Sequence, residues 1–332
     1  MSDRAAAPRL ALSGVARVFN SIRQSQMLVA LLIAVALFLI GGLFTRNFFA
    51  LTNIGNILAL TTILGLAGAG QTLVVVSGGG IDLSVGAVMS FGAIMTVQTM
   101  NSLNANILPA ILIVLLMGVL VGAFNAIGVI WTQVPAMVMT MATASVVVAV
   151  QWIYCNGMPT GHPAPAITYL GAGREIPFLP WIVVVGILTV LLIQLLLNRT
   201  VYGRQMLAAG NNASAAFLSG VRVKLVQGLA FLIAGVLNAV AGFWFAAYNT
   251  YVAVGSCNIY VMPSIAAIVI GGTSLAGGKG SYLGTMVGAL VLTLLNNLLV
   301  LLQTDEAGRQ VANGIVLIVL LAAYNREPRI RQ

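Results

Sequence analysis

Long apolar runs alternate with short polar segments along nearly the whole chain. Most runs hold about 20 residues, which is the length that crosses the hydrocarbon core of a bilayer as a helix. Helices are expected rather than barrel strands, because a helix satisfies its backbone hydrogen bonds within one segment. The pattern predicts an all-α polytopic membrane protein with about ten transmembrane helices and glycine-rich helix breaks. The expected spans are 27–44, 54–76, 83–100, 107–131, a run that follows Pro135 and ends near Tyr154, 180–197, 225–247, 263–270, 282–302 and a last one that ends at Tyr324.

The polar segments divide the chain into one domain with two tails. Residues 1–26 and 325–332 are polar and basic, and they flank a transmembrane domain at 27–324. Residues 155–179 form the longest outer loop, and its prolines and glycines predict an irregular structure. Residues 198–224 form the one substantial inner loop.

The composition supports a membrane protein and excludes a soluble one. The 332 residues are 60% hydrophobic and only 6% charged, whereas soluble domains carry about 25% charged residues. Most of the surface of such a chain is expected to contact membrane lipid. The net charge of +9 does not indicate nucleic acid, because the basic residues are scattered among the loops.

The basic residues also predict the orientation of the chain. Ten spans place both termini on one side, and the positive-inside rule makes that side cytoplasmic. The inner segments then hold Arg4, Arg9, Arg17, Arg23, Arg199, Arg204, Arg222, Lys224, Lys279, Arg326, Arg329 and Arg331, and the outer segments hold Arg46, Arg174 and Arg309.

An acidic residue interrupts the apolar sequence within residues 77–86. An acid in a membrane-like stretch is costly and usually faces protein or a water-filled cavity, while glycines permit sharp bends and close helix contacts. Asp82 either caps the helix that follows or belongs to a broken helix at membrane depth, where transporters tend to bind their substrates. The two interpretations do not exclude each other. The residues assigned to this first break are Gly79, Gly80, Asp82, Ser84 and Gly86.

The same pattern returns after the run 263–270, which is too short to cross a bilayer alone. That run either begins earlier, near Tyr251, or is re-entrant. The two glycine segments share the frame Gly-Gly-x-x-Leu-small-x-Gly, and Ser274 stands where the first copy has its acid. Transporters often contain internal repeats with breaks at corresponding positions, although a short match in a glycine-rich chain also arises by chance. The glycines assigned to the second break are Gly271, Gly272, Gly277 and Gly278.

No catalytic or metal-binding constellation is visible. His162 is the single histidine, and the two cysteines, Cys155 and Cys257, make neither a disulfide scaffold nor a metal site. A bridge between the two cysteines stays open. The residues around Lys279 resemble a phosphate loop, but Gly280 follows the lysine where the motif requires serine or threonine. No cofactor is therefore expected in this chain, and if ATP drives it, another subunit binds the ATP.

The inner loop contains a second candidate site. Asn211 or Asn212 suits a helix N-cap, the residues that follow favour a helix, and Gly220 suits its end. A short helix across an inner loop fits docking into a partner, and an ordinary linker with topogenic arginines is the alternative. The candidate docking residues are Asn211, Asn212, Ala213, Ser214, Ala215, Phe217, Leu218, Ser219 and Gly220.

From about residue 50 to 325, the chain resembles the ribose-type permease subunits of bacterial ABC sugar importers. The resemblance is carried by residues 79–86, 218–221 and 265–280, together with the pair Asn296–Asn297. It implies two permease subunits that form the pore, cytoplasmic ATPase domains that bind ATP and Mg, and a periplasmic sugar-binding protein. It also implies a multi-pass protein of the bacterial inner membrane whose loop at 211–220 contacts the ATPase.

The chain departs from the family pattern at two places. Ala213 and Phe217 stand where the family often has glutamate and arginine, and residues 261–263 replace an acidic pair before Ile265. These lost charges leave open whether the second permease subunit is an identical or a different chain.

The sequence therefore predicts a permease subunit, not itself an enzyme, of an ATP-driven importer of a ribose-type monosaccharide. The alternative is a secondary transporter of a small polar solute, but only Asp82 supplies an ionisable group in mid-span for ion coupling. The sugar is not specified. Six polar residues either line a polyol path or make hydrogen bonds between helices, namely Asn125, Gln151, Gln194, Asn238, Asn296 and Asn297.

Overall fold

The computed structural model describes residues 26–44, 47–176, 178–249, 251–305, 307–312 and 314–315. Within them, seven helices are long and apolar enough to cross a membrane. These are α2 (Gln26–Phe44), α3 (Leu51–Val76), α5 (Ile107–Ala126) continued by the π-helix η2 (Ile127–Trp131), α6 (Ala136–Tyr154), α8 (Trp181–Arg199), α11 (Val223–Tyr248) and α13 (Tyr282–Leu301). The described residues contain no strand beyond one isolated bridge, so the all-α prediction is confirmed.

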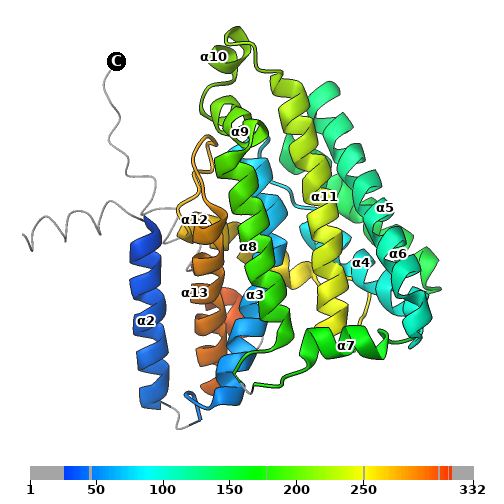
Figure 1. The fold of residues 1–332 in the computed structure, drawn as a ribbon, viewed down its shortest axis with the longest axis vertical. Coiled ribbons are helices and arrows are strands. Elements are labelled where there is room, and N and C mark those ends of the chain that lie inside the picture. Colours follow the sequence, from blue (N-terminus) through cyan, green and yellow to red (C-terminus); the bar gives the residue numbers. More distant parts are fainter. Residues whose placement is uncertain are drawn as a thin grey trace, which may run out of the picture.

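Shorter helices complete the bundle. Two are apolar, α4 (Val85–Met100) and the 3-10 turn η3 (Asn258–Tyr260) continued by α12 (Val261–Ile270). The remaining ones are η1 (Asn104–Asn106), α7 (Pro165–Ala172), α9 (Val201–Asn211) and α10 (Ala213–Leu218). Figure 1 shows α9 and α10 at one end of the molecule and α7 at the other. The two ends are called the α9–α10 end and the α7 end below.

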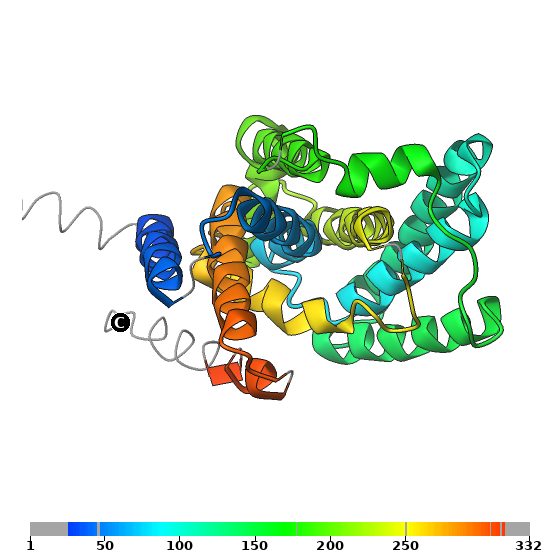
Figure 2. The ribbon, with the colours of Figure 1, turned by 90° about the horizontal axis from the view of Figure 1, so that it is seen from below.

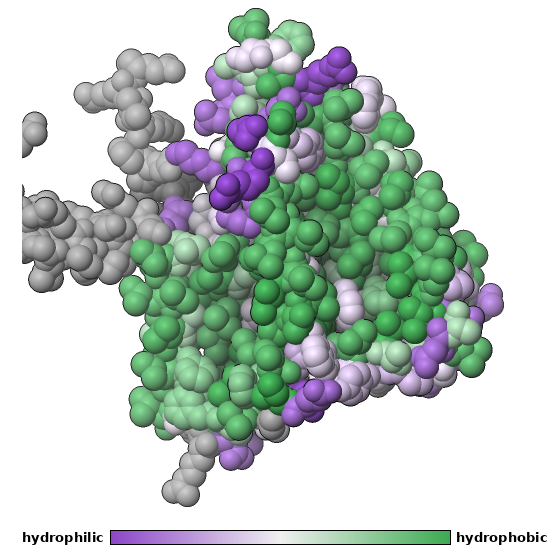
Figure 3. All heavy atoms as spheres, in the orientation of Figure 1, coloured by the Kyte–Doolittle hydropathy of each residue, from purple (hydrophilic) through white to green (hydrophobic). Residues whose placement is uncertain are grey.

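Helix α3 occupies the centre of the bundle. Its apolar stretch is 94% buried, and α4, α8, α11, α12 and α13 pack around it (Figure 2). Figure 3 shows apolar side chains over the middle of one face and hydrophilic ones gathered at the two ends. This is the distribution expected of a protein whose sides face lipid and whose ends face water.

Small residues bring the central helices into backbone contact. A Cβ atom on Gly118 of α5 would lie 2.8 Å from the carbonyl oxygen of Gly235 on α11, and one on Gly122 would lie 2.7 Å from the oxygen of Phe231. Gly92 of α4 meets Ala239 of α11 in the same way, at 2.5 Å. Helices in lipid gain stability from such close packing, because no hydrophobic effect drives them together.

Two segments differ from the sequence predictions. The outer loop 155–179 is not irregular throughout, because it contains α7, whose Pro165 lies in the first turn, where a missing N–H is tolerated. Residues 251–257 are not helical, so the proposed helix from Tyr251 is wrong. The C-terminal end of this segment lies inside the bundle, where the Cys257 N–H donates to Ser90 Oγ at 2.9 Å.

The segment 251–270 is not re-entrant either. It begins after α11 at the α7 end and leads, through α12 and the second glycine break, to α13 at the α9–α10 end (Figure 1). It joins the two ends as an extended stretch followed by a short helix.

Two further sequence predictions concern the cysteines and the two ends of the chain. The two cysteines are free and buried, so they do not form a bridge. The tails and most of the last expected span lie outside the described residues.

Candidate functional site

The two glycine breaks end their helices with the same backbone geometry. Gly78 at the end of α3 has φ of 75°, and Gly272 at the end of α12 has φ of 90°. In each case the N–H of the next residue donates to the carbonyl five residues earlier, at 3.0 and 2.9 Å. This is a Schellman-type end, which requires a left-handed residue and therefore favours glycine.

When the two breaks are aligned by their helix ends, the alignment is shifted by two residues from the alignment of their sequences. The sequence frame aligns Gly80 with Gly272, whereas the helix ends equate Gly78 with Gly272. Farther along, Gly86 lies in the first turn of α4, while Gly278 lies in the loop before α13. The two copies share a way of ending a helix, and the residues that follow are not equivalent.

Asp82 lies at the centre of a buried polar network between α3 and α4. Its Oδ1 accepts hydrogen bonds from the Ser84 N–H at 2.8 Å and from Ser84 Oγ at 2.6 Å. Its Oδ2 accepts one from Asn238 Nδ2 of α11 at 3.3 Å, and Asn125 Nδ2 of α5 donates to Ser84 Oγ at 3.0 Å. All four residues are buried. The network therefore ties the first break to two neighbouring helices.

The capping interpretation of Asp82 needs correction. The N-cap position of α4 is Ser84, and its side chain makes no capping hydrogen bond. Asp82 binds the N–H of Ser84 itself instead of an amide in the first turn. Because its partners are neutral hydrogen-bond donors, the side chain is satisfied through the network and not through an ion pair.

Both breaks touch helix α9 through backbone atoms. The Gly278 N–H donates to the Val76 carbonyl at 3.0 Å, which joins the two breaks directly. A Cβ on Gly210, near the end of α9, would lie 2.5 Å from the Gly278 nitrogen, and one on Gly78 would lie 3.0 Å from the Gly210 Cα. We call this contact of Gly78, Gly210 and Gly278 the glycine junction. It leaves no room for side chains.

The other glycines of the breaks also lie at tight positions. Gly80 has φ of 99°, and a Cβ there would lie 2.7 Å from Ala136. Gly277 has φ of 89°, and its Cβ would lie 3.0 Å from the Gly210 oxygen. Gly271 packs against the backbone of Gly284. Gly79 shows no positive φ and lies against Phe231 and Ser77.

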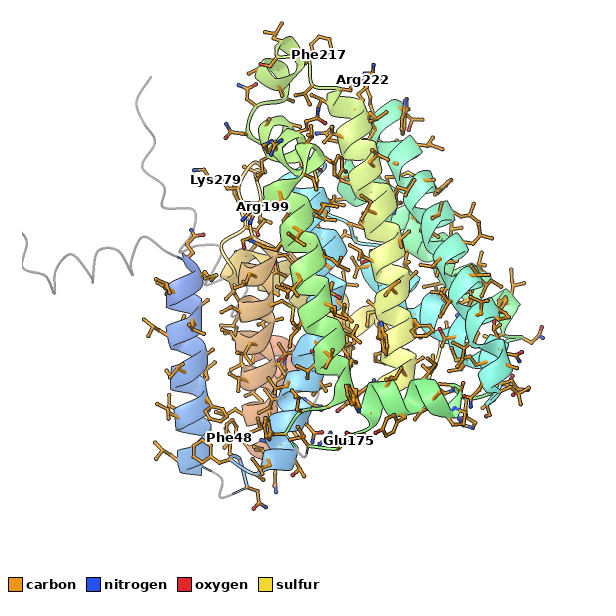
Figure 4. The ribbon with its side chains drawn as sticks, viewed as in Figure 1. Phe48, Glu175, Arg199, Phe217, Arg222 and Lys279 are labelled. Atoms are coloured by element: carbon orange, nitrogen blue, oxygen red, sulfur yellow. The ribbon has the colours of Figure 1, made fainter. Side chains whose placement is uncertain are left out.

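Helix α10 is the short helix expected in the inner loop. Asn212 is its N-cap, since its Oδ1 accepts from the Ala215 N–H at 2.9 Å, while Asn211 belongs to α9. Gly220 follows the helix with φ of 85°. Phe217 is 70% exposed and Leu218 is 85% exposed, and Figure 4 shows Phe217 at the extreme of the α9–α10 end. The polar candidates Ser214 and Ser219 and the small Ala213 are exposed there too.

Sequence reasoning missed helix α9. Its Thr200 N-cap accepts from the Gly203 N–H at 3.0 Å, and its amphipathic pattern buries Met206 and Ala209. The Tyr202 hydroxyl donates to the Val226 carbonyl of α11 at 2.9 Å. Burial raises the pKa of Tyr202, so the hydroxyl stays protonated and the hydrogen bond persists at physiological pH. The available signal was the spacing of Gly203, Met206 and Ala209, three residues apart, which places them on one face of a helix.

The polar candidates for a polyol path do not converge. Apart from the two in the Asp82 network, Gln151 donates to the Ala87 carbonyl at 3.0 Å, and Asn297 donates to Asn53 at 3.2 Å. Gln194 lies on α8 with a buried side-chain oxygen. The contacts of Gln151 and Asn297 are hydrogen bonds between helices, in keeping with one of the two sequence interpretations. Asn296 donates to the Leu292 carbonyl of its own helix at 3.1 Å.

Comparisons with known proteins place this sequence in a family. A family model described as the permease component of a branched-chain amino acid transport system matches residues 53–323. The chain is 33% identical to the ribose import permease protein RbsC of Haemophilus influenzae over 309 residues, which cover 91% of this chain and 93% of the relative.

Two further relatives are similar over nearly their full length. Identity is 31% to the ribose import permease protein RbsC of Escherichia coli K12, covering 92% of this chain and 94% of the relative. It is 34% to the autoinducer 2 import system permease protein LsrC of Yersinia pseudotuberculosis, covering 91% and 87%. No solved structure gives a significant match.

The described residues form a polytopic helical bundle with broken helices and a pair of short helices outside the spans. The relatives are transport components rather than enzymes. The chain belongs to the family of ribose-type ABC importer permeases.

The Asp82 network yields a prediction about stability. Asp82→Asn should lower the free energy of unfolding by about 1–3 kcal/mol, because one of its oxygens becomes a donor facing the amide donor of Asn238. The double variant Asp82→Asn, Asn238→Asp restores a donor–acceptor pair and should recover part of the loss. Thermal unfolding of the purified protein measures both, alongside uptake and expression. Single and double variants with the same midpoint as the wild type would contradict the role of the pair.

The glycine junction yields a second prediction. Gly210→Val should lower the unfolding midpoint, because its Cβ overlaps the backbone of both breaks, and overpacking costs about 1–3 kcal/mol. Ala208→Val also introduces a valine, at an exposed position of the same helix, and should leave the midpoint nearly unchanged. Equal effects of the two substitutions would show that the close approach at Gly210 is unimportant.

Proposed function

We propose that this chain is the membrane-spanning permease subunit of an ATP-driven importer that moves a monosaccharide or a closely related small carbohydrate into a bacterial cytoplasm. The observation that carries the proposal is the path from α10 through α9 to both helix breaks, because it links a free docking surface to the interior of the bundle. The substrate class is supported by the relatives, which are named for the import of ribose and of autoinducer 2.

The proposed orientation places the α9–α10 end in the cytoplasm. Figure 4 shows Arg199, Arg222 and Lys279 at this end and the acidic Glu175 at the α7 end. Cytoplasmic segments of membrane proteins carry the excess of lysine and arginine. The basic residues at the α9–α10 end are Arg199, Arg204, Arg222, Lys224 and Lys279.

The proposed partner at this end is an ABC ATPase. Phe217 and Leu218 lie outside the spans, so their exposed apolar side chains face water unless a protein covers them. An aromatic anchor in an apolar pocket is a common centre of an interface. The ATP and its Mg would be bound by that partner, and this chain would contribute only the docking helix.

Coupling would pass through α9. Because α9 follows α8 directly and contacts both breaks through backbone atoms, a shift of α10 on its partner would change the packing at the glycine junction. The junction has no flexible side chains to absorb such a shift. Closure of the ATPase would in this way shift the helices next to Asp82 from one arrangement to another.

The proposal includes two further partners. A periplasmic binding protein would deliver the sugar at the α7 end. A second permease subunit, identical or different, would complete the pore, in keeping with the implied architecture of the family.

The orientation is tested by cysteine labelling in intact cells. Met158→Cys at the α7 end should react with a membrane-impermeant maleimide, and Ser214→Cys on α10 should react only after the membrane is opened. Both positions are exposed, and both native cysteines are buried. Labelling of Ser214→Cys in intact cells would reverse the proposed orientation.

The function is tested by uptake into vesicles that contain the permease, its ATPase and its binding protein. We expect sugar uptake that requires ATP and resists ionophores. Phe217→Ala should weaken binding of the ATPase by about 2 kcal/mol, roughly thirtyfold in Kd. Less ATPase should then copurify with the permease, and uptake should fall with it.

Phe124→Ala is the matched control for this test, because Phe124 is an exposed phenylalanine within a span. It should leave both assembly and uptake intact. Uptake that ionophores abolish would contradict ATP drive, whereas undiminished assembly by Phe217→Ala would remove only the docking role of α10.

A further inference from the structure

An apolar cleft of about 290 Å³ lies between α5, η2 and α11 on the side of the bundle. Helices α5 and α11 touch at Gly122 and Leu232, and the cleft opens beyond that contact, toward the α9–α10 end. Its lining has no hydrogen-bonding side chain except the indole of Trp131, so a sugar is not a suitable occupant. The other lining residues include Ile127, Leu225, Gly228 and Leu229.

Local backbone features create this cleft. The chain forms a π-helix at Ile127–Trp131, and such turns are frequent at functional sites. The turn places the Trp131 ring over a helix position without a side chain, since a Cβ on Gly228 would lie 3.1 Å from Trp131 Cη2. Trp131 is 57% exposed, as is typical of tryptophan at a membrane interface.

Two cations stand at the mouth of the cleft. Lys224 lies one helical turn before Gly228 and so on the same face of α11, and Arg222 immediately precedes the helix, three residues before Leu225. Both side chains are exposed, and in the described part of the chain neither makes an ion pair. Figure 4 shows Arg222 at the start of α11.

We propose that this cleft binds an anionic phospholipid from the leaflet at the α9–α10 end, with one acyl chain in the cleft and the phosphate on Arg222 and Lys224. The apolar lining fits an acyl chain, and the two cations complement a negative headgroup. The site is independent of the proposed transport function, because it requires neither the ATPase nor a substrate.

A second apolar cleft provides the internal contrast. It has about 190 Å³ and lies between α3, α8 and α13, where Thr61, Gly186 and Met286 are among the lining residues. Its lining residues lie within the spans, and no lysine or arginine lies within four residues of any of them, whereas Lys224 is next to Leu225 of the first cleft. This cleft fits an acyl chain without selecting a headgroup.

The test uses the purified full chain in phosphatidylcholine vesicles that contain a minor fraction of either brominated phosphatidylglycerol or brominated phosphatidylcholine. Bromine on the acyl chain quenches nearby tryptophan fluorescence, and the difference between wild type and Trp131→Phe isolates the signal of Trp131. We expect stronger quenching by the brominated phosphatidylglycerol. Each cation removed should lower this preference about fivefold, so the double variant Arg222→Gln, Lys224→Gln should respond equally to both lipids.

The matched control is Arg199→Gln, Arg204→Gln, which removes two cations at the same end but away from the cleft, and it should keep the preference. Equal quenching of the wild type by both lipids would reduce the cleft to ordinary lipid contact. A preference that survives the double variant would overturn the role of the two cations. Absence of quenching by either lipid would show that a protein partner, such as a second copy of the chain, occupies the cleft.

Discussion

The backbone contact among Gly78, Gly210 and Gly278 constrains the packing at the α9–α10 end. Three segments from distant parts of the sequence meet there, and the Gly278 N–H donates to the Val76 carbonyl within the same contact. Since no Cβ atom fits, the end of α3, the end of α9 and the loop before α13 are fixed relative to one another. A rigid backbone contact transmits a displacement more directly than long side chains, which can change rotamer.

The two breaks are nevertheless held differently. The first is fixed by the junction and also by the network in which Asp82 binds Ser84 and Asn238. In the second, Ser274 lies in the matching sequence position, and its N–H donates to the Lys279 carbonyl within the same loop. A buried carboxylate requires several partners, because an unsatisfied charge in an apolar surrounding is costly. The first break is therefore attached to α5 and α11, while the second is free of such ties.

Near the α9–α10 end, exposed apolar side chains lie in two different surroundings. Phe217 lies beyond the spans, where water makes its exposure unfavourable and a protein partner would cover it. Leu225 lies at the start of a span, where lipid is as apolar as the side chain and exposure costs nothing. Exposure of an apolar side chain thus indicates a protein interface on α10 and a lipid contact on α11, a few residues apart.

The sequence by itself determined the all-α membrane class, most of the spans, the places where α3 and α12 end, and the short helix that became α10. These features depend on hydropathy and on local helix signals such as Asn212 and Gly220, which act within a few residues. The sequence also supplied the family resemblance. Only the tertiary structure decided the partners of Asp82, the register of the two breaks and the course of residues 251–270, because these depend on contacts between distant segments. Gly210 illustrates the reason: in the sequence it is one glycine among 36, and its importance comes from two backbones that packing brings against it.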